Sequence, residues 1–210
     1  MIDLEEQEQV DALKAWWKQY GKTVVMAVIV FIATVAGIQG WRYYQSNQAN
    51  QAAALYSQLE NAAQAKDTKK IRDAAGQIIE KFPSTPYAAR AALISASANY
   101  DSGDAKSAKA QLEWVVGHTK EAPIMDMARL RLAGVLLDEK NFAEALKLLD
   151  TKHGETYNGL YADLRGDIMA AQGKVEDARK AYNDSIQKTD EKSPFRKYIQ
   201  IKLDSLGEAK

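Results

Sequence analysis

Cysteine is absent from the 210 residues, and charge of one sign does not predominate. A chain without cysteine can form no disulfide, no thiolate metal site and no cysteine nucleophile. Because 28 basic residues are balanced by 28 acidic residues, the sequence has no basic field that would attract a phosphate backbone. Nucleic acid is therefore not an expected partner.

Sequence patterns that carry catalysis are missing too. There is no glycine-rich phosphate loop, no nucleophile elbow and no His-Glu-x-x-His helix. The two histidines, His118 and His153, stand beside predicted helix ends without a carboxylate at a metal-ligand spacing, so loop or C-capping roles are expected for them. We expect no catalytic residue, no metal and no cofactor, and the protein is predicted not to be an enzyme.

One stretch, residues 23–41, contains no charged residue and is rich in large aliphatic side chains. As a helix it would reach roughly 28 Å, close to the thickness of the hydrocarbon layer of a membrane, and insertion should be favourable by roughly 3–5 kcal/mol. A buried core helix is the first alternative, but such helices usually carry charge on one edge. A cleaved signal peptide is the second, but this stretch is longer than a signal core and is followed by bulky aromatic residues. An uncleaved membrane anchor is the better interpretation.

The charges beside the span predict its orientation. Three lysines precede it, whereas Arg42 is the only cation after it before Lys66. The positive-inside rule counts cations and gives acidic residues little weight, so the N-terminal tail is predicted to be cytoplasmic although it includes Asp3, Glu5 and Glu6. The predicted organisation is a cytoplasmic amphipathic tail (1–22), a transmembrane helix (23–41) and an extracytoplasmic domain (42–210).

Apolar and aromatic side chains flank the span in a helical pattern. Val10, Leu13, Trp17 and Tyr20 recur at spacings of three and four, so one face of the tail is expected to lie on membrane lipid. Aromatic residues are typical of both interfaces of a membrane span. Here they are Trp16, Trp17 and Tyr20 before the span, and Trp41, Tyr43 and Tyr44 after it.

Beyond Ser46 the composition predicts short, paired helices that repeat. Alanine, leucine, lysine and glutamine dominate at helical spacing, and the four prolines fall at breaks between amphipathic stretches. Turns near residues 101–108, 139–145 and 172–178 each lead into an alanine, and these alanines are 37 and 33 residues apart, which brackets the 34-residue tetratricopeptide period. The equivalent alanines are Ala108, Ala145 and Ala178.

Individual positions support that period. Gly166, Gly173, Ala178 and Tyr182 fall at the small, turn, small and aromatic positions of the last copy. A degenerate first hairpin runs through Leu55, Leu59, Ala75 and Ile79, and a helix over residues 195–206 would cap the array. The predicted fold is all-α, a single transmembrane helix followed by a tetratricopeptide-like solenoid, with an unrelated helical bundle as the alternative.

A tetratricopeptide stack offers a concave surface, lined mainly by the first helix of each hairpin, that can hold a peptide. Its mixed apolar and charged character would suit unfolded or partner polypeptide. The alternative for each residue is that it packs only against the next repeat. The predicted protein-binding residues are Arg90, Leu93, Tyr100, Met127, Leu130, Leu137, Leu160, Asp163 and Asp167.

Three sequence elements carry a resemblance to a known family. They are Trp-Lys-Gln-Tyr-Gly-Lys at 17–22, Gly-Trp-Arg-Tyr-Tyr at 40–44 and Tyr-Ala-Asp-Leu-Arg-Gly-Asp at 161–167. With the acidic tail and the alanine-rich repeats, the chain resembles the YfgM family, the ancillary subunit of the SecYEG translocon. The resemblance implies a type II inner-membrane protein with a periplasmic repeat domain. It also implies association with the translocon and with the chaperone PpiD in assisting exported proteins.

A regulatory role is the alternative. Members of that family are also linked to restraint of the RcsB stress response, so the chain could instead be an envelope adaptor that acts through its cytoplasmic tail. Deleting residues 2–18 should separate the two, because an adaptor would lose its effect whereas an export helper would keep most of it. A membrane-bound enzyme is the third and weakest hypothesis.

Overall fold

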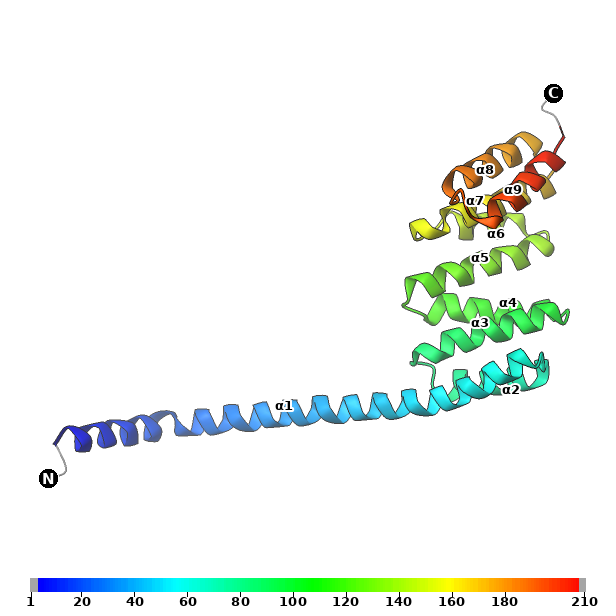
Figure 1. Ribbon diagram of the computed structural model, residues 1–210. Coiled ribbons are helices and arrows are strands. Elements are labelled where there is room, and N and C mark those ends of the chain that lie inside the picture. Colours follow the sequence, from blue (N-terminus) through cyan, green and yellow to red (C-terminus); the bar gives the residue numbers. More distant parts are fainter. Residues whose placement is uncertain (1–3, 208–210) are drawn as a thin grey trace. The chain divides into compact units, whose positions relative to one another are not determined.

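The computed structural model describes residues 4–207, with side chains from residue 7 onward (Figure 1). Within that range every regular element is a helix, which confirms the all-α prediction. Asp3 lies outside the described residues, as do the side chains of Glu5 and Glu6. The chain divides into two compact units between Asn50 and Gln51, and each is described by itself.

The first unit is the N-terminal part of a single long helix, α1 (Leu4–Gln64). This helix is long and apolar enough to cross a membrane, and no side chain of its most apolar 18-residue window is buried. Phe31 is 69% exposed and Ile32 is 60% exposed. A core helix would cover such side chains, because leaving them in water is unfavourable by roughly 2 kcal/mol each. The exposure therefore favours lipid as the environment of this segment.

The ends of the apolar stretch have the predicted aromatic clusters. Trp16 lies 5.9 Å from Tyr20, and Trp41 lies 6.0 Å from Tyr44, measured between ring centroids. The helix does not end after Trp41, so the boundary drawn there falls inside α1, and the second compact unit begins only at Gln51. The contact of the tail with lipid and its cytoplasmic location stay predictions.

The second unit is a stack of helical hairpins. The last part of α1 pairs with α2, and α3 with α4, α5 with α6 and α7 with α8 follow, each hairpin packing on the next (Figure 1). Helix α9 packs on α8 at the end, where a cap was predicted. The bounds are α2 (Thr68–Lys81), α3 (Pro86–Asp101), α4 (Ala105–His118), α5 (Ala122–Asp138), α6 (Phe142–Leu149), α7 (Asn158–Ala171), α8 (Val175–Lys188) and α9 (Pro194–Ser205), with a 3-10 turn η1 (Glu155–Tyr157) before α7.

The repeat is also visible in the backbone. The turn inside each hairpin contains one residue with positive φ: Lys66 at 53°, Gly103 at 84°, Lys140 at 58° and Gly173 at 74°. These residues are 37, 37 and 33 residues apart. A left-handed residue after a helix lets the next amide bond back to the helix, as Asp104 N–H does to the Asn99 carbonyl at 2.8 Å. Because Lys66 takes this conformation too, the weak first hairpin is a true copy of the repeat.

Small residues allow the two helices of each hairpin to approach closely. Ala108, Ala145 and Ala178 are each 0% exposed, as expected for positions where two helices approach closely. In the last hairpin a Cβ on Gly166 would lie 2.4 Å from Cε1 of Tyr182. The missing side chain at residue 166 is therefore what lets the Tyr182 ring fill the space between α7 and α8.

Candidate functional site

A hollow of about 350 Å³ opens between α3 and α5. Its walls are mostly apolar, and its rim is polar because the Tyr100 hydroxyl donates a hydrogen bond to the Asp138 carboxylate. That hydrogen bond, with some burial and the charge of Asp138, raises the pKa of Tyr100 above its usual value. The lining residues are Ala96, Ser97, Tyr100, Leu112, Arg131, Gly134, Val135, Leu137 and Asp138.

A second hollow of about 570 Å³ adjoins the first, with α1, α2 and α3 as its walls. It is more polar, and it shares Ser97 and Arg131 with the first hollow. Its lining residues are Ala63, Lys66, Thr68, Ile71, Ile94, Ser97, Ala98, Asp101, Ser102 and Arg131. We refer to the two hollows together as the inner groove. Most of their lining residues belong to α3 and α5, the first helices of two successive hairpins, and α1 contributes Ala63.

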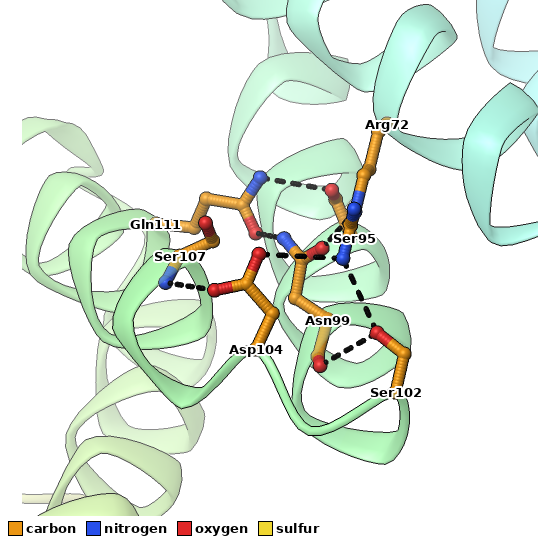
Figure 2. A network of polar contacts seen from close by, with 7 residues as sticks. All are labelled: Arg72, Ser95, Asn99, Ser102, Asp104, Ser107 and Gln111. Carbon is orange, nitrogen blue, oxygen red and sulfur yellow. Dashed lines mark hydrogen bonds and ion pairs between the residues drawn. The ribbon is translucent and has the colours of Figure 1, made fainter.

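A polar network centred on the buried Asn99 joins the helices beside the second hollow (Figure 2). Asn99 is 1% exposed and lies between the Arg72 guanidinium, which donates to its carbonyl oxygen, and Gln111, which accepts from its amide at 2.8 Å. Arg72 also donates to the Ser102 hydroxyl at 3.2 Å and pairs with Asp104 at 3.3 Å. Because these contacts join α2 to α3 and the start of α4, they fix the first hairpin against the second.

Arg131 differs from most arginines of the repeats. Arg72, Arg90, Arg129, Arg165 and Arg179 each pair with a carboxylate. In the part of the chain that the structure describes, no carboxylate forms an ion pair with Arg131, whose guanidinium donates one hydrogen bond, to the Leu93 carbonyl at 3.3 Å. Its side chain is exposed at the junction of the two hollows.

Of the predicted binding residues, the structure brings Tyr100 and Leu137 together in the first hollow. Met127 and Leu130 pack against the main core, and Leu160 is half-buried outside the hollows. Leu93 is also placed differently from the prediction: it is buried in the core, because α3 is covered by α2, α4 and α5. Its side chain is therefore not open to a peptide.

The predicted charged residues serve contacts between helices instead. Arg90 donates to both carboxylate oxygens of Glu121, at 2.9 and 2.7 Å, and so ties α3 to the residue before α5. This bidentate pair lowers the pKa of Glu121 below its usual value. Asp163 and Asp167 both accept from the Lys202 ammonium, at 2.9 and 2.7 Å, and fasten the capping helix α9 to α7.

The pair of aspartates under α9 is partly desolvated. Burial raises the pKa of Asp163 although Lys202 lies beside it, and one of its carboxylate oxygens has no hydrogen-bond partner. Burial lowers the pKa of Lys202, but its bonds to both aspartates outweigh that effect and raise it overall. Asp163 was predicted to face a peptide, and the structure instead places it beneath α9, where Lys202 covers it.

Sequence reasoning passed over Ser97, Arg131 and Gly134. They lie three or four residues beyond predicted positions, on the same faces of α3 and α5, so helical spacing alone could have found them. Ser97 and Gly134 have small side chains or none, which do not mark a binding surface in a sequence, and nothing in the sequence distinguishes Arg131 from arginines that pair with a carboxylate, such as Arg90.

Comparison with known proteins agrees with this architecture. A family model described as a tetratricopeptide repeat-like domain matches residues 14–208. The ancillary SecYEG translocon subunit of Neisseria gonorrhoeae is 32% identical over 207 residues, which cover 97% of this chain and 98% of that protein. The chain belongs to the ancillary SecYEG translocon subunit family. The subunits of Haemophilus influenzae (32% identical, 88% of this chain and 90% of that protein) and Escherichia coli (31%, 96% and 97%) are similar to it as well.

Membership of this family confirms the resemblance drawn from the three sequence elements. The matched residues include the apolar part of α1 together with all the hairpins, so the candidate membrane span belongs to the shared architecture. The tetratricopeptide-like prediction for the second unit is confirmed by the same match.

The histidines occupy structural positions. The His118 ring stacks on Trp114 at 4.5 Å, and its Nδ1 is 2.8 Å from the Trp114 carbonyl at the end of α4. The His153 ring packs at 4.0 Å from Tyr161 in the loop before α7. Among the described residues, no three histidine, aspartate or glutamate side chains are placed to hold a metal ion.

Proposed function

We propose that this chain is a non-enzymatic inner-membrane protein that associates with the SecYEG translocon and with PpiD and assists the export or folding of periplasmic proteins. The similarity to ancillary SecYEG translocon subunits over nearly the whole chain is the observation that carries this proposal. The exposed apolar window of α1 supplies an anchor in lipid. The inner groove supplies a surface on which an unfolded polypeptide can lie.

The proposed orientation has the N-terminal tail in the cytoplasm and the repeats in the periplasm. The three lysines before the span and the single Arg42 after it support this direction. Alkaline phosphatase, which is active only in the periplasm, should be active when fused after Lys210. An active fusion after Lys14 combined with an inactive one after Lys210 would contradict the orientation.

Association is tested by affinity purification from gently solubilised membranes. The translocon and PpiD should be recovered with the full-length protein. Their absence at normal expression would refute the association.

Client binding needs a test that reports on the groove. A photo-crosslinking amino acid in place of Ser97, which lines both hollows, should capture newly exported polypeptides. The same amino acid in place of Glu113, which is exposed on α4 and lines neither hollow, is the matched control. Equal capture at both positions would show that the groove is not the client site.

The second candidate function is an envelope adaptor that restrains RcsB, and it depends on the N-terminal tail. Gln7, Glu8 and Asp11 are exposed in α1 on the N-terminal side of the interface aromatics, which leaves a polar surface for a cytoplasmic partner. Removal of residues 2–18 should leave recovery of the translocon largely unchanged. If the deletion instead abolishes control of the stress response and client crosslinking is unaffected, the adaptor function stands beside the export function.

A further inference from the structure

Among the residues that the structure describes, Arg131 forms no ion pair, whereas most other arginines of the repeats pair with a carboxylate. The only other arginine of the described repeats without a carboxylate is Arg196, which donates to the Ile186 and Thr189 carbonyls at 3.0 and 3.2 Å. Arg131 has one such bond, at 3.3 Å. A guanidinium has five N–H donors in a planar fork that matches a carboxylate. Most of the hydrogen-bonding capacity of Arg131 is therefore open to a ligand.

The neighbours of Arg131 limit what the ligand can be. On one side the hollow between α3 and α5 has apolar walls of Leu112, Val135 and Leu137, which suit a large apolar side chain. The carboxylate of Asp138 at its rim is already bonded to the Tyr100 hydroxyl. Across the two hollows the cations Arg131 and Lys66 are balanced by the anions Asp101 and Asp138, so the lining has no net charge. Arg131 is the only one of these four that lines both hollows, so the charged group at their junction is a cation.

We propose that the inner groove binds an unfolded polypeptide segment through two of its side chains, an acidic one that pairs with Arg131 and a large apolar one that enters the hollow between α3 and α5. This rests on the proposed function, since it names the class of client segment that the groove selects. Successive side chains of an extended chain point to opposite sides, so both groups face the groove when they are two residues apart. The preferred segment is therefore acidic-x-apolar.

In this proposal the carboxylate that binds Arg131 belongs to an internal side chain of the client. Synthetic peptides can distinguish such a side chain from the carboxylate at a chain end. The test uses full-length protein in nanodiscs and fluorescent peptides with acetylated and amidated ends and a glycine-serine background. One carries Asp-x-Leu, one Asn-x-Leu and one Lys-x-Leu. A fourth peptide carries leucine and a free C-terminal carboxylate but no acidic side chain. Fluorescence anisotropy gives the four dissociation constants.

The Asp-x-Leu peptide should bind at least about tenfold more tightly than the other three, because a charge-assisted, two-pronged bond is lost in each of them. In Arg131→Gln protein the Asp and Asn peptides should bind equally. In Arg131→Glu the order of the Asp and Lys peptides should reverse. Lys147→Glu makes the same charge change at an exposed residue of α6 outside the groove, and it should leave all four constants unchanged.

Equal binding of the Asp, Asn and Lys peptides to the unmodified protein would overturn the proposal, as would a preference for Asp that survives in Arg131→Gln. Tighter binding of the peptide with the free C-terminus would assign the carboxylate to a chain end and overturn the internal segment. Absence of all peptide binding would also overturn it. The translocon should still be recovered from membranes by affinity purification of each Arg131 variant. Loss of peptide binding in the groove can therefore be distinguished from loss of the proposed association with the translocon.

Discussion

Replacing Gly166 by alanine should loosen the last hairpin. The new Cβ would lie 2.4 and 2.5 Å from two carbons of the Tyr182 ring, which is 3% exposed and has no room to retreat. Overpacking of this kind costs roughly 1–3 kcal/mol. Displacing the ring also weakens the 2.7 Å bond from its hydroxyl to Asp167, worth about 1.5 kcal/mol, while alanine returns about 1 kcal/mol of helix propensity. We expect α7 and α8 to be destabilised by about 2–3 kcal/mol.

Gly76→Ala is the matched control. Residue 76 lies in α2, and a Cβ there would meet no atom within 4 Å, so alanine should stabilise that helix by up to about 1 kcal/mol. Hydrogen–deuterium exchange of the full-length protein in nanodiscs reports each hairpin separately. In Gly166→Ala the amides of residues 175–188 should exchange at least about tenfold faster, since each 1.4 kcal/mol is a factor of ten in the opening equilibrium. Unchanged exchange of α8 in Gly166→Ala would refute the close-approach reasoning, and adding Tyr182→Leu should remove most of the effect.

Three further predictions use the same measurement. Asn99→Ala leaves Arg72 and Gln111 without their shared partner, so α3 should open more easily by about 1–3 kcal/mol; unchanged protection of α3 would contradict this. Lys202→Met leaves two desolvated aspartates without their cation, so α9 should lose about 2 kcal/mol of protection, and Lys202→Arg should keep most of it. The pKa of Glu121 is lowered in the folded protein, so the stability that its ion pair with Arg90 contributes is fully present above the ordinary pKa of 4.5 and is lost as the pH falls through the lower folded value. Glu121→Gln should abolish this acid-dependent loss of protection in α3 and α5. A pH profile that the substitution leaves unaltered would rule out this role for Glu121.

The architecture could be predicted from the sequence because its signals are local. Ala108, Ala145 and Ala178 mark close helix approaches at a repeating distance, and a glycine marks two of the turns. The other two turns use Lys66 and Lys140 in the same left-handed conformation, which costs a lysine roughly 1 kcal/mol. This conformation allows the next amide to bond back to the helix, from Asp67 to the Ala62 carbonyl at 2.9 Å and from Asn141 to the Leu136 carbonyl at 2.8 Å. The turn at Lys140 was predicted from the repeat spacing, whereas residue type gave no sign of the turn at Lys66, and the first hairpin was therefore predicted only as a degenerate copy.

The site was harder to predict because it depends on pairing across helices. Arg90 and Arg131 are both cations on first helices of hairpins, yet Arg90 meets Glu121 and Arg131 meets no carboxylate among the described residues. Asp163 looks like a surface residue in the sequence, and it is 6% exposed because α9 folds back over it. Such differences are set by residues 30 to 40 positions away, which helical spacing cannot reveal.

The leading helix of the first hairpin has no beginning of its own, because α1 runs from the apolar window into the repeats without interruption. Its amides near Gln51 lie within α1 and bond to carbonyls one turn earlier in the helix. A water-soluble fragment cut at this point would start with about four bare amide hydrogens and a turn that must nucleate alone. A fragment that lacks the anchor should therefore keep Asn50, whose side chain can cap the new helix end, and replacing Asn50 by alanine in that fragment should increase fraying of the first repeat.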